Sequence, residues 1–150
     1  MVINTKSFGE VDVQEDKVIN FEPSIPGFPD SKRYMLMYES DNPDENIFCW
    51  LQSVDQPEIA FAVLDSGKVF KDYSPVIEDS ELGELKHTNE EDLLLYNIVV
   101  IPDDVENLSA NLKAPVLIDS KRRIGKQVIA NNDDYQVRHY IIEELRSRNG

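Results

Sequence analysis

The apolar residues of this chain lie in short segments, which turn-forming residues separate at intervals of about 8 to 12. Valine, isoleucine, tyrosine and phenylalanine dominate these segments, and helical periodicity is scarce. We expect strands over residues 2–4, 9–13, 18–21, 34–39, 48–53, 60–64, 96–101, 110–112, 116–119, 125–130 and 135–141. With 150 residues, the chain has the size of one domain. We predict an all-β fold, a single antiparallel, partly open β-barrel over residues 1–150 with one or two short helices.

Two turn signals indicate antiparallel pairing of neighbouring strands. Gly9 with Glu10, and the run 131–134, contain residues that tolerate positive φ and suit hairpins. Pro43 lacks the N–H that a central strand needs, so the pattern predicts an exposed loop at 41–44. Residues 89–94 and 142–146 fit short helices, and we expect the polar tail 142–150 to be helical or frayed.

The charge balance restricts the class of partner. The chain has 29 Asp and Glu against 15 Lys and Arg, a formal net charge of −14. Proteins grip a phosphate backbone through clustered lysine and arginine, whereas acidic runs recur along this chain. We therefore expect no direct binding of nucleic acid, and we expect any strongly charged partner to be basic.

Two further features indicate where the protein works. No apolar stretch approaches the roughly 20 residues that cross a bilayer, and the N-terminus has no apolar run after a basic start. We expect a cytoplasmic protein that does not associate with membranes.

Cys49 lies within the apolar run 47–51 with no basic neighbour to lower its pKa, which favours a buried structural thiol over a reactive one.

The residues that usually carry catalysis form no recognisable motif. His87 and His139 occur in no zinc-binding spacing, and Ser53 lacks the glycine-flanked turn that exposes a nucleophile. The six glycines are too dispersed for a phosphate-binding loop. We expect no enzyme activity, no metal and no cofactor.

Two other functions stay open at this stage. A β-barrel with so many acids could bind a small ligand, or hydrolyse one with a carboxylate pair. A deep pocket with two convergent, poorly solvated acids would favour that function. A barrel that binds single-stranded nucleic acid needs basic and aromatic residues on one face, and only 121–123 is locally basic.

Two longer segments contain polar residues within otherwise apolar strands, and both resemble a known family. Residues 51–61 read Leu-Gln-Ser-Val-Asp-Gln-Pro-Glu-Ile-Ala-Phe, and residues 111–118 read Asn-Leu-Lys-Ala-Pro-Val-Leu-Ile. They resemble the two signature segments of the flagellar assembly factor FliW family. Shorter matches lie at 3–5, 8–9, 25–28, 99–102, 125–129, 135 and 138–139. The resemblance covers nearly the whole chain, with departures at 22–24, Ala62, Ser66 and Asp119, the last of which stands where the family has asparagine.

This resemblance implies a switch between two protein partners. FliW-like proteins bind flagellin in the cytoplasm; after flagellin is exported, the freed protein binds the translational repressor CsrA, which then releases the flagellin message. The family is thought to act on CsrA allosterically. The acidic charge of this chain agrees with a repressor as partner, because a protein that binds RNA is basic. Attraction between opposite charges speeds the encounter of the two proteins, and the acidic protein repels RNA from the complex. We expect the protein to be monomeric when alone.

The candidate partner-binding residues come from the two resembling segments and the acidic turn. They are Gln52, Ser53, Asp55, Pro57, Asn111, Lys113, Pro115, Asp133, Asp134 and Tyr135. The alternative is that they only satisfy buried backbone groups at strand ends. If the partner hypothesis holds, alanine at Gln52 or Asp55 weakens binding and leaves melting nearly unchanged. We expect a core containing Phe21, Phe28, Trp50, Phe61, Leu112 and Ile118, each worth about 1.5 to 3 kcal/mol when buried.

Overall fold

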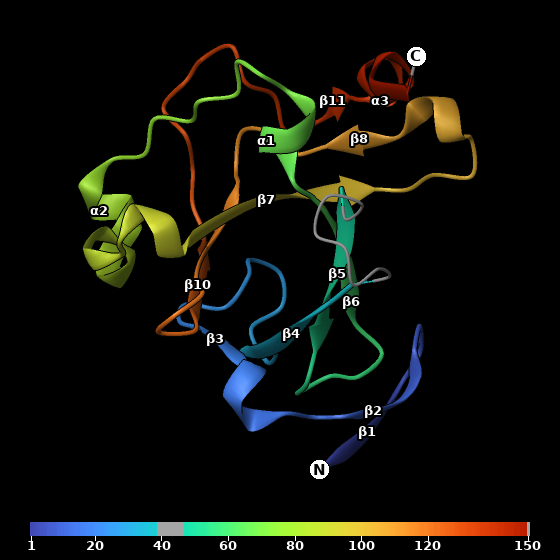
Figure 1. Cartoon of the computed structure of the whole chain (residues 1–150), viewed down its shortest axis with the longest axis vertical. Coiled ribbons are helices and arrows are strands. Elements are labelled where there is room, and N and C mark those ends of the chain that lie inside the picture. The colour runs from blue at the N-terminus through green and yellow to red at the C-terminus, as the bar shows by residue number, and fades with distance from the viewer. Residues whose placement is uncertain (39–46, 150) are drawn as a thin grey trace.

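The computed structural model describes residues 1–38 and 47–149, and most of its regular structure is β-strand (Figure 1). The strands are β1 (Val2–Thr5), β2 (Gly9–Asp12), β3 (Ile19–Phe21), β4 (Arg33–Met37), β5 (Phe48–Ser53), β6 (Ala60–Leu64), β7 (Leu93–Val100), β8 (Ser109–Ala110), β9 (Val116–Asp119), β10 (Ile124–Gln127) and β11 (His139–Tyr140). The predicted all-β class is confirmed. Residue 39 of the expected strand 34–39 and the expected loop at 41–44 lie outside the described residues.

Seven strands form a closed barrel. Their order is β7-β6-β5-β4-β3-β10-β9, and β9 pairs again with β7. The eight-residue β7 makes closure possible because its first half, 93–96, pairs with β9, whereas 97–98 pair with β6. We expected a partly open barrel, and this second pairing of β7 is what closes it.

One neighbouring pair in the barrel is parallel, which corrects the expectation of a purely antiparallel barrel. β10 runs parallel to β3, with Ile124 opposite Asn20 and Gly125 opposite Phe21. Strand direction cannot alternate all the way around a closed ring that has an odd number of strands. A seven-stranded barrel therefore requires at least one parallel pair.

A small sheet extends the barrel at one end. The last residues of β7, Val99 and Val100, pair with β8, and β8 pairs with β11. We expected a hairpin at 131–134 and a strand over 135–141. The hairpin is wrong, because β10 and β11 pair with other strands, and the strand shortens to His139–Tyr140. The residues before His139 bond outside a strand ladder: Tyr135 N–H donates to the Asn132 carbonyl at 3.3 Å, and the Gln136 carbonyl accepts from Leu112 and Lys113 N–H. By contrast, the expected Gly9 turn joins the β1–β2 hairpin, with φ of 66° at Gly9.

The helices are short and lie outside the barrel. They are α1 (Ser66–Val69), α2 (Asp79–Leu82) and α3 (Ile142–Asn149), with 3-10 turns η1 (Glu15–Lys17), η3 (Gly83–His87), η4 (Glu90–Asp92) and η5 (Val105–Asn107). The expected helix in the tail is confirmed as α3. The helix expected at 89–94 shrinks to η4, since the chain joins the barrel at Leu93. Helices α1 and α2 were not predicted, because four residues are too few to show a helical period. Among the described residues, no helix has both the length and the apolarity needed to span a membrane.

The main core fills the barrel, and a second core lies beneath α3. The barrel core contains Ile19, Phe21, Ile25, Tyr34, Cys49, Leu51, Val63, Tyr96, Val116 and Ile118. The second contains Ala62, Leu64, Val99, Leu108, Ala110, Leu112 and Ile141. The predicted burial of Phe21, Leu112 and Ile118 is confirmed, whereas Phe28, Phe61 and Trp50 are half-buried against these clusters. Cys49 is buried, as the sequence predicted.

Candidate functional site

Gln52, the second residue of the first resembling segment, directs its side chain into the protein. The residue is only 1% exposed, which agrees with the alternative that it satisfies buried backbone groups at a strand end. Its amide nitrogen donates to the carbonyl oxygens of Ser53 and Pro57 at 2.8 and 2.9 Å, and to that of Ile59 at 3.2 Å. These bonds hold the chain between β5 and β6 in its folded path. The Gln52 side chain supports this loop and presents no surface of its own.

Ser53 is also fully buried, which again agrees with the alternative of satisfying buried groups. Its hydroxyl lies 2.5 Å from that of Ser31 and accepts a hydrogen bond from the Gln56 backbone N–H at 2.9 Å. Pro57, in the same loop, is half-buried, and its carbonyl oxygen also accepts from Lys6 N–H at 3.4 Å. Both residues tie the loop to neighbouring chain segments.

Asp55 fastens the same loop to β4. Its carboxylate accepts from the backbone N–H groups of Lys32 and Arg33 at 2.8 and 3.0 Å, and from Arg33 Nε at 2.8 Å. Partial burial opposes ionisation, but these donors and the arginine charge outweigh it and lower the pKa of Asp55. Part of the Asp55 side chain stays exposed, so a partner can reach this carboxylate as well as the exposed Glu58 of the same segment.

The second resembling segment follows β8 and is also tightly bonded. Asn111 Oδ1 accepts from Ala114 N–H at 3.0 Å, and Lys113 Nζ donates to the Asn132 carbonyl at 2.8 Å. Pro115 is buried, and its carbonyl accepts from Val128 N–H at 2.9 Å. Asn111 and Lys113 are half-buried. The segment therefore serves as a tie between β8, β10 and the chain around residue 132.

The acidic turn contains the most accessible of the candidate residues. Asp133 and Asp134 are exposed, and Tyr135 is half-buried. The Tyr135 hydroxyl accepts from Ser74 N–H at 2.7 Å, which joins the turn to the chain that follows α1. Within residues 1–38 and 47–149, no hydrogen bond or ion pair holds the side chain of Asp133 or Asp134, whereas Gln52 and Ser53 are bonded within the fold.

The structure divides the candidate residues into two groups. Gln52 and Ser53 end β5, and Asp55 and Pro57 lie in the loop between β5 and β6, in the lower half of the molecule in Figure 1. Asn111, Lys113, Pro115 and the acidic turn gather at the upper end, where Leu112 and Lys113 N–H both donate to the Gln136 carbonyl at 3.1 and 3.2 Å. The two resembling segments do not form one surface.

Beside the acidic turn lies a cavity of about 460 Å³ that the sequence did not reveal. We call it the aromatic–acidic pocket; it is lined by Val69, Phe70, Lys71, Asp72, Tyr73, Leu112, Asp134, Tyr135, His139 and Glu144. Phe70 meets His139 edge to face, with ring centroids 5.3 Å apart, and Tyr73 and Tyr135 lie 4.9 Å apart. The two rings of each pair are more than 60 residues apart in sequence, so no local pattern could have indicated the pocket.

Tyr73 is fixed by two hydrogen bonds at the base of this pocket. Its hydroxyl donates to the Leu112 carbonyl at 2.7 Å and accepts from Asn97 Nδ2 at 2.9 Å. Burial raises the pKa of Tyr73 to about 12, even though the bond from Asn97 acts in the opposite direction. The raised pKa keeps the Tyr73 phenol neutral at physiological pH. The two hydrogen bonds hold its ring in place.

Asp65 is a partly buried carboxylate, and acid–base hydrolysis would require a second acid beside it. Burial raises the pKa of Asp65 against the opposing charge of Lys68, and Asp65 lines a cavity of about 270 Å³. No second acid lines that cavity among the described residues. Nor do the described residues contain a group of three or more His, Cys, Asp or Glu able to hold a metal ion.

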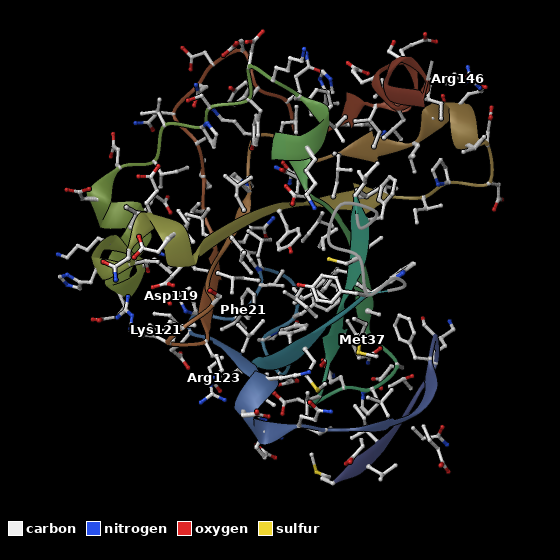
Figure 2. The ribbon with its side chains drawn as sticks, in the orientation of Figure 1. Phe21, Met37, Asp119, Lys121, Arg123 and Arg146 are labelled. Atoms are coloured by element: carbon white, nitrogen blue, oxygen red, sulfur yellow. The ribbon has the colours of Figure 1, made fainter. Side chains whose placement is uncertain are left out.

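Two of the three side chains of the locally basic run 121–123 bond within the fold; Figure 2 labels Lys121 and Arg123 together with Asp119. Arg122 Nε donates to Asp119 at 2.8 Å, and Arg123 Nη1 donates to the Glu15 carbonyl at 2.6 Å. These bonds occupy the guanidinium groups that a nucleic-acid surface would offer.

Comparison with known proteins agrees with this architecture. The sequence profile of the family described as FliW protein matches residues 2–141. The flagellar assembly factor FliW of Thermoanaerobacter pseudethanolicus is 44% identical over 148 residues, covering 98% of this chain and 97% of that protein. The one from Ruminiclostridium cellulolyticum is 40% identical over 150 residues, with 99% of each covered. A crystal structure of the flagellar assembly factor FliW superposes with a TM-score of 0.83 at 34% identity, covering 94% of this chain and 96% of that one. The chain belongs to the FliW family of flagellar assembly factors.

Proposed function

We propose that this protein is a cytoplasmic regulator that binds a CsrA-type translational repressor and, as a competing partner, flagellin. When bound to the repressor, it relieves repression of the flagellin message. Membership of the flagellar assembly factor family supports this function most directly.

The distribution of charge supports the repressor as a partner. The chain has a net charge of −14, and Asp133 and Asp134 are exposed beside the second resembling segment. A repressor that binds RNA presents a basic surface, so encounter with an acidic protein is electrostatically favoured. The same charge repels RNA from the complex.

Titration calorimetry against purified CsrA, and separately against flagellin, tests the proposal. We expect saturable binding of both, with repressor binding that weakens as salt rises from about 50 to 500 mM because exposed charges are screened. Flagellin added to the repressor complex should displace the repressor. Absence of binding to both partners would overturn the proposed function.

A pair of charge-matched variants locates the repressor surface. The double variant Asp133→Asn/Asp134→Asn removes two exposed charges beside the second resembling segment, and we expect repressor affinity at low salt to fall about 2- to 10-fold. The control Glu90→Gln/Glu91→Gln removes two exposed charges at η4 and should leave affinity nearly unchanged. Equal effects of the two variants would mean that net charge alone governs binding.

A further inference from the structure

The aromatic–acidic pocket combines aromatic rings and carboxylates, two kinds of group that attract cations. Four aromatic rings line it, those of Phe70, Tyr73, Tyr135 and His139. Three carboxylates, Asp72, Asp134 and Glu144, line it against one lysine, Lys71. We propose that this pocket receives an arginine side chain from the basic protein partner.

Charge and ring electrostatics both favour a cation here. An aromatic face carries negative potential, and cations bind over such faces within about 6 Å of the ring centre. The exposed Asp72 and Asp134 add negative charge at the pocket, and Glu144 lies 3.3 Å from His139 Nε2. An anionic ligand would meet an excess of carboxylates.

The lining groups and the volume of the pocket favour arginine over lysine. A guanidinium is planar, stacks on rings and donates through a fork to carboxylates, whereas an ammonium is a compact point charge. Apolar side chains from Val69 and Leu112 also line the cavity and suit the aliphatic stem of an arginine. A volume of about 460 Å³ leaves room for the whole side chain.

The pocket is held in shape before any ligand arrives. The hydroxyl of Tyr73 is bonded on two sides, and that of Tyr135 accepts from Ser74 N–H. Preorganised rings lose little conformational freedom on binding, which benefits affinity. The source of the arginine, a basic repressor, rests on the proposed function; the preference of the pocket for a guanidinium does not.

Amide-resolved NMR titration with three small probes tests the pocket. The probes are Nα-acetyl-arginine methylamide, its lysine counterpart, and the citrulline counterpart, which has nearly the same shape as arginine without the charge. We expect saturable shifts at the amides of residues 69–73, 112 and 134–139 with arginine, about 3- to 10-fold weaker binding with lysine, and no saturation with citrulline. Shifts that spread evenly over the acidic surface, or equal binding of citrulline, would overturn the inference.

A matched pair of variants adds a second test. Asp134→Asn should weaken the arginine probe about 3- to 10-fold, whereas Asp103→Asn, an exposed acid outside the pocket, should leave it unchanged. Phe70→Leu keeps an apolar side chain and removes one ring, so it should weaken arginine binding as well. Unchanged probe affinity in both Asp134→Asn and Phe70→Leu would contradict the proposal.

These outcomes separate the pocket from the proposed function. If the arginine probe binds the pocket but calorimetry detects no binding of the repressor, the arginine preference of the pocket is upheld and the proposed partner is wrong. If the repressor binds and the probe leaves the pocket amides unshifted, the function stands and the pocket is not its arginine site.

Discussion

A Cβ atom on Gly125 would lie 2.6 Å from the ring of Phe21, with two more ring carbons at 2.7 and 3.0 Å. The two residues face each other across the parallel pair of β3 and β10. Phe21 is completely buried and packs edge to face on Tyr34, with ring centroids 5.1 Å apart, so it has no free space to enter. The missing side chain at Gly125 is what allows β10 to approach β3.

Gly125→Ala should therefore lower the free energy of unfolding by about 1 to 3 kcal/mol, the usual cost of an overpacked core. Urea denaturation measures it. The control is Gly67→Ala in α1, where the added Cβ would meet only Asp65 Oδ1 at 3.7 Å and stability should change by less than about 1 kcal/mol. An unchanged urea midpoint for Gly125→Ala would show that the Phe21 ring can move aside.

Asp119, at the end of β9, should make the fold sensitive to acid. Its buried carboxylate accepts from Lys121 N–H, Arg122 N–H, Arg122 Nε and Thr88 Oγ1, all within 3.0 Å. Burial opposes ionisation, yet these donors lower the pKa of Asp119 to about 2. In the unfolded chain the pKa is about 3.9. Ionised Asp119 therefore stabilises the folded protein fully at pH values above the unfolded pKa. This contribution is lost as the pH falls from about 4 towards 2.

The variant Asp119→Asn tests this assignment. It keeps one acceptor oxygen but removes the charge that Arg122 faces, so we expect a loss of about 1.5 to 3 kcal/mol at pH 7. Urea denaturation at several pH values should show a shallower decline below pH 5 for the variant than for the parent protein. Parallel declines in the two proteins would assign the acid sensitivity to other carboxylates.

Gln52→Ala should destabilise the protein, which replaces the expectation of nearly unchanged melting. Removing the buried amide leaves the carbonyls of Pro57 and Ile59 without this donor, at a cost of about 1 to 3 kcal/mol. Thermal melting followed by circular dichroism measures the effect. Glu58→Ala, an exposed position in the same loop, should stay within about 0.5 kcal/mol. Lost partner binding with unchanged melting would instead support the original hypothesis that Gln52 contacts the partner.

Cys49 should resist thiol reagents as long as the protein is folded. The residue is 1% exposed, and burial raises the pKa of its thiol to about 12, so almost no thiolate forms at neutral pH. Ellman's reagent should react with the native protein far more slowly than with protein in about 8 M urea. Comparable rates in both conditions would mean that the barrel opens readily around β5.

Local sequence patterns predicted strands well but could not predict which strands are neighbours. The apolar run around Cys49 and the turn at Gly9 are local features, and both appear as expected. Leu93 and Leu94 were assigned to a helix because acids precede them, yet pairing with β9 draws them into β7. The parallel contact of Phe21 with Gly125 joins residues about a hundred positions apart and leaves no local trace.

The candidate site shows the same limit. The sequence identified Gln52 and Ser53 as unusual because polar residues in apolar strands need partners, and the structure shows that those partners lie within the chain. Exposure of Asp133 and Asp134 followed from local polarity. The ring pair of Tyr73 and Tyr135 depends on tertiary packing and could not be anticipated.

The second pairing of β7 also has a consequence for aggregation. A sheet edge with unpaired backbone groups is a template on which other chains can add strands. Closure through β9 removes such edges from the seven barrel strands, and β11 at the end of the added sheet is only two residues long. The edge of β2 carries the exposed charges of Glu10 and Asp12. Of the strands described, none offers a long apolar edge, so the protein should remain dispersed at high concentration even when it has no partner.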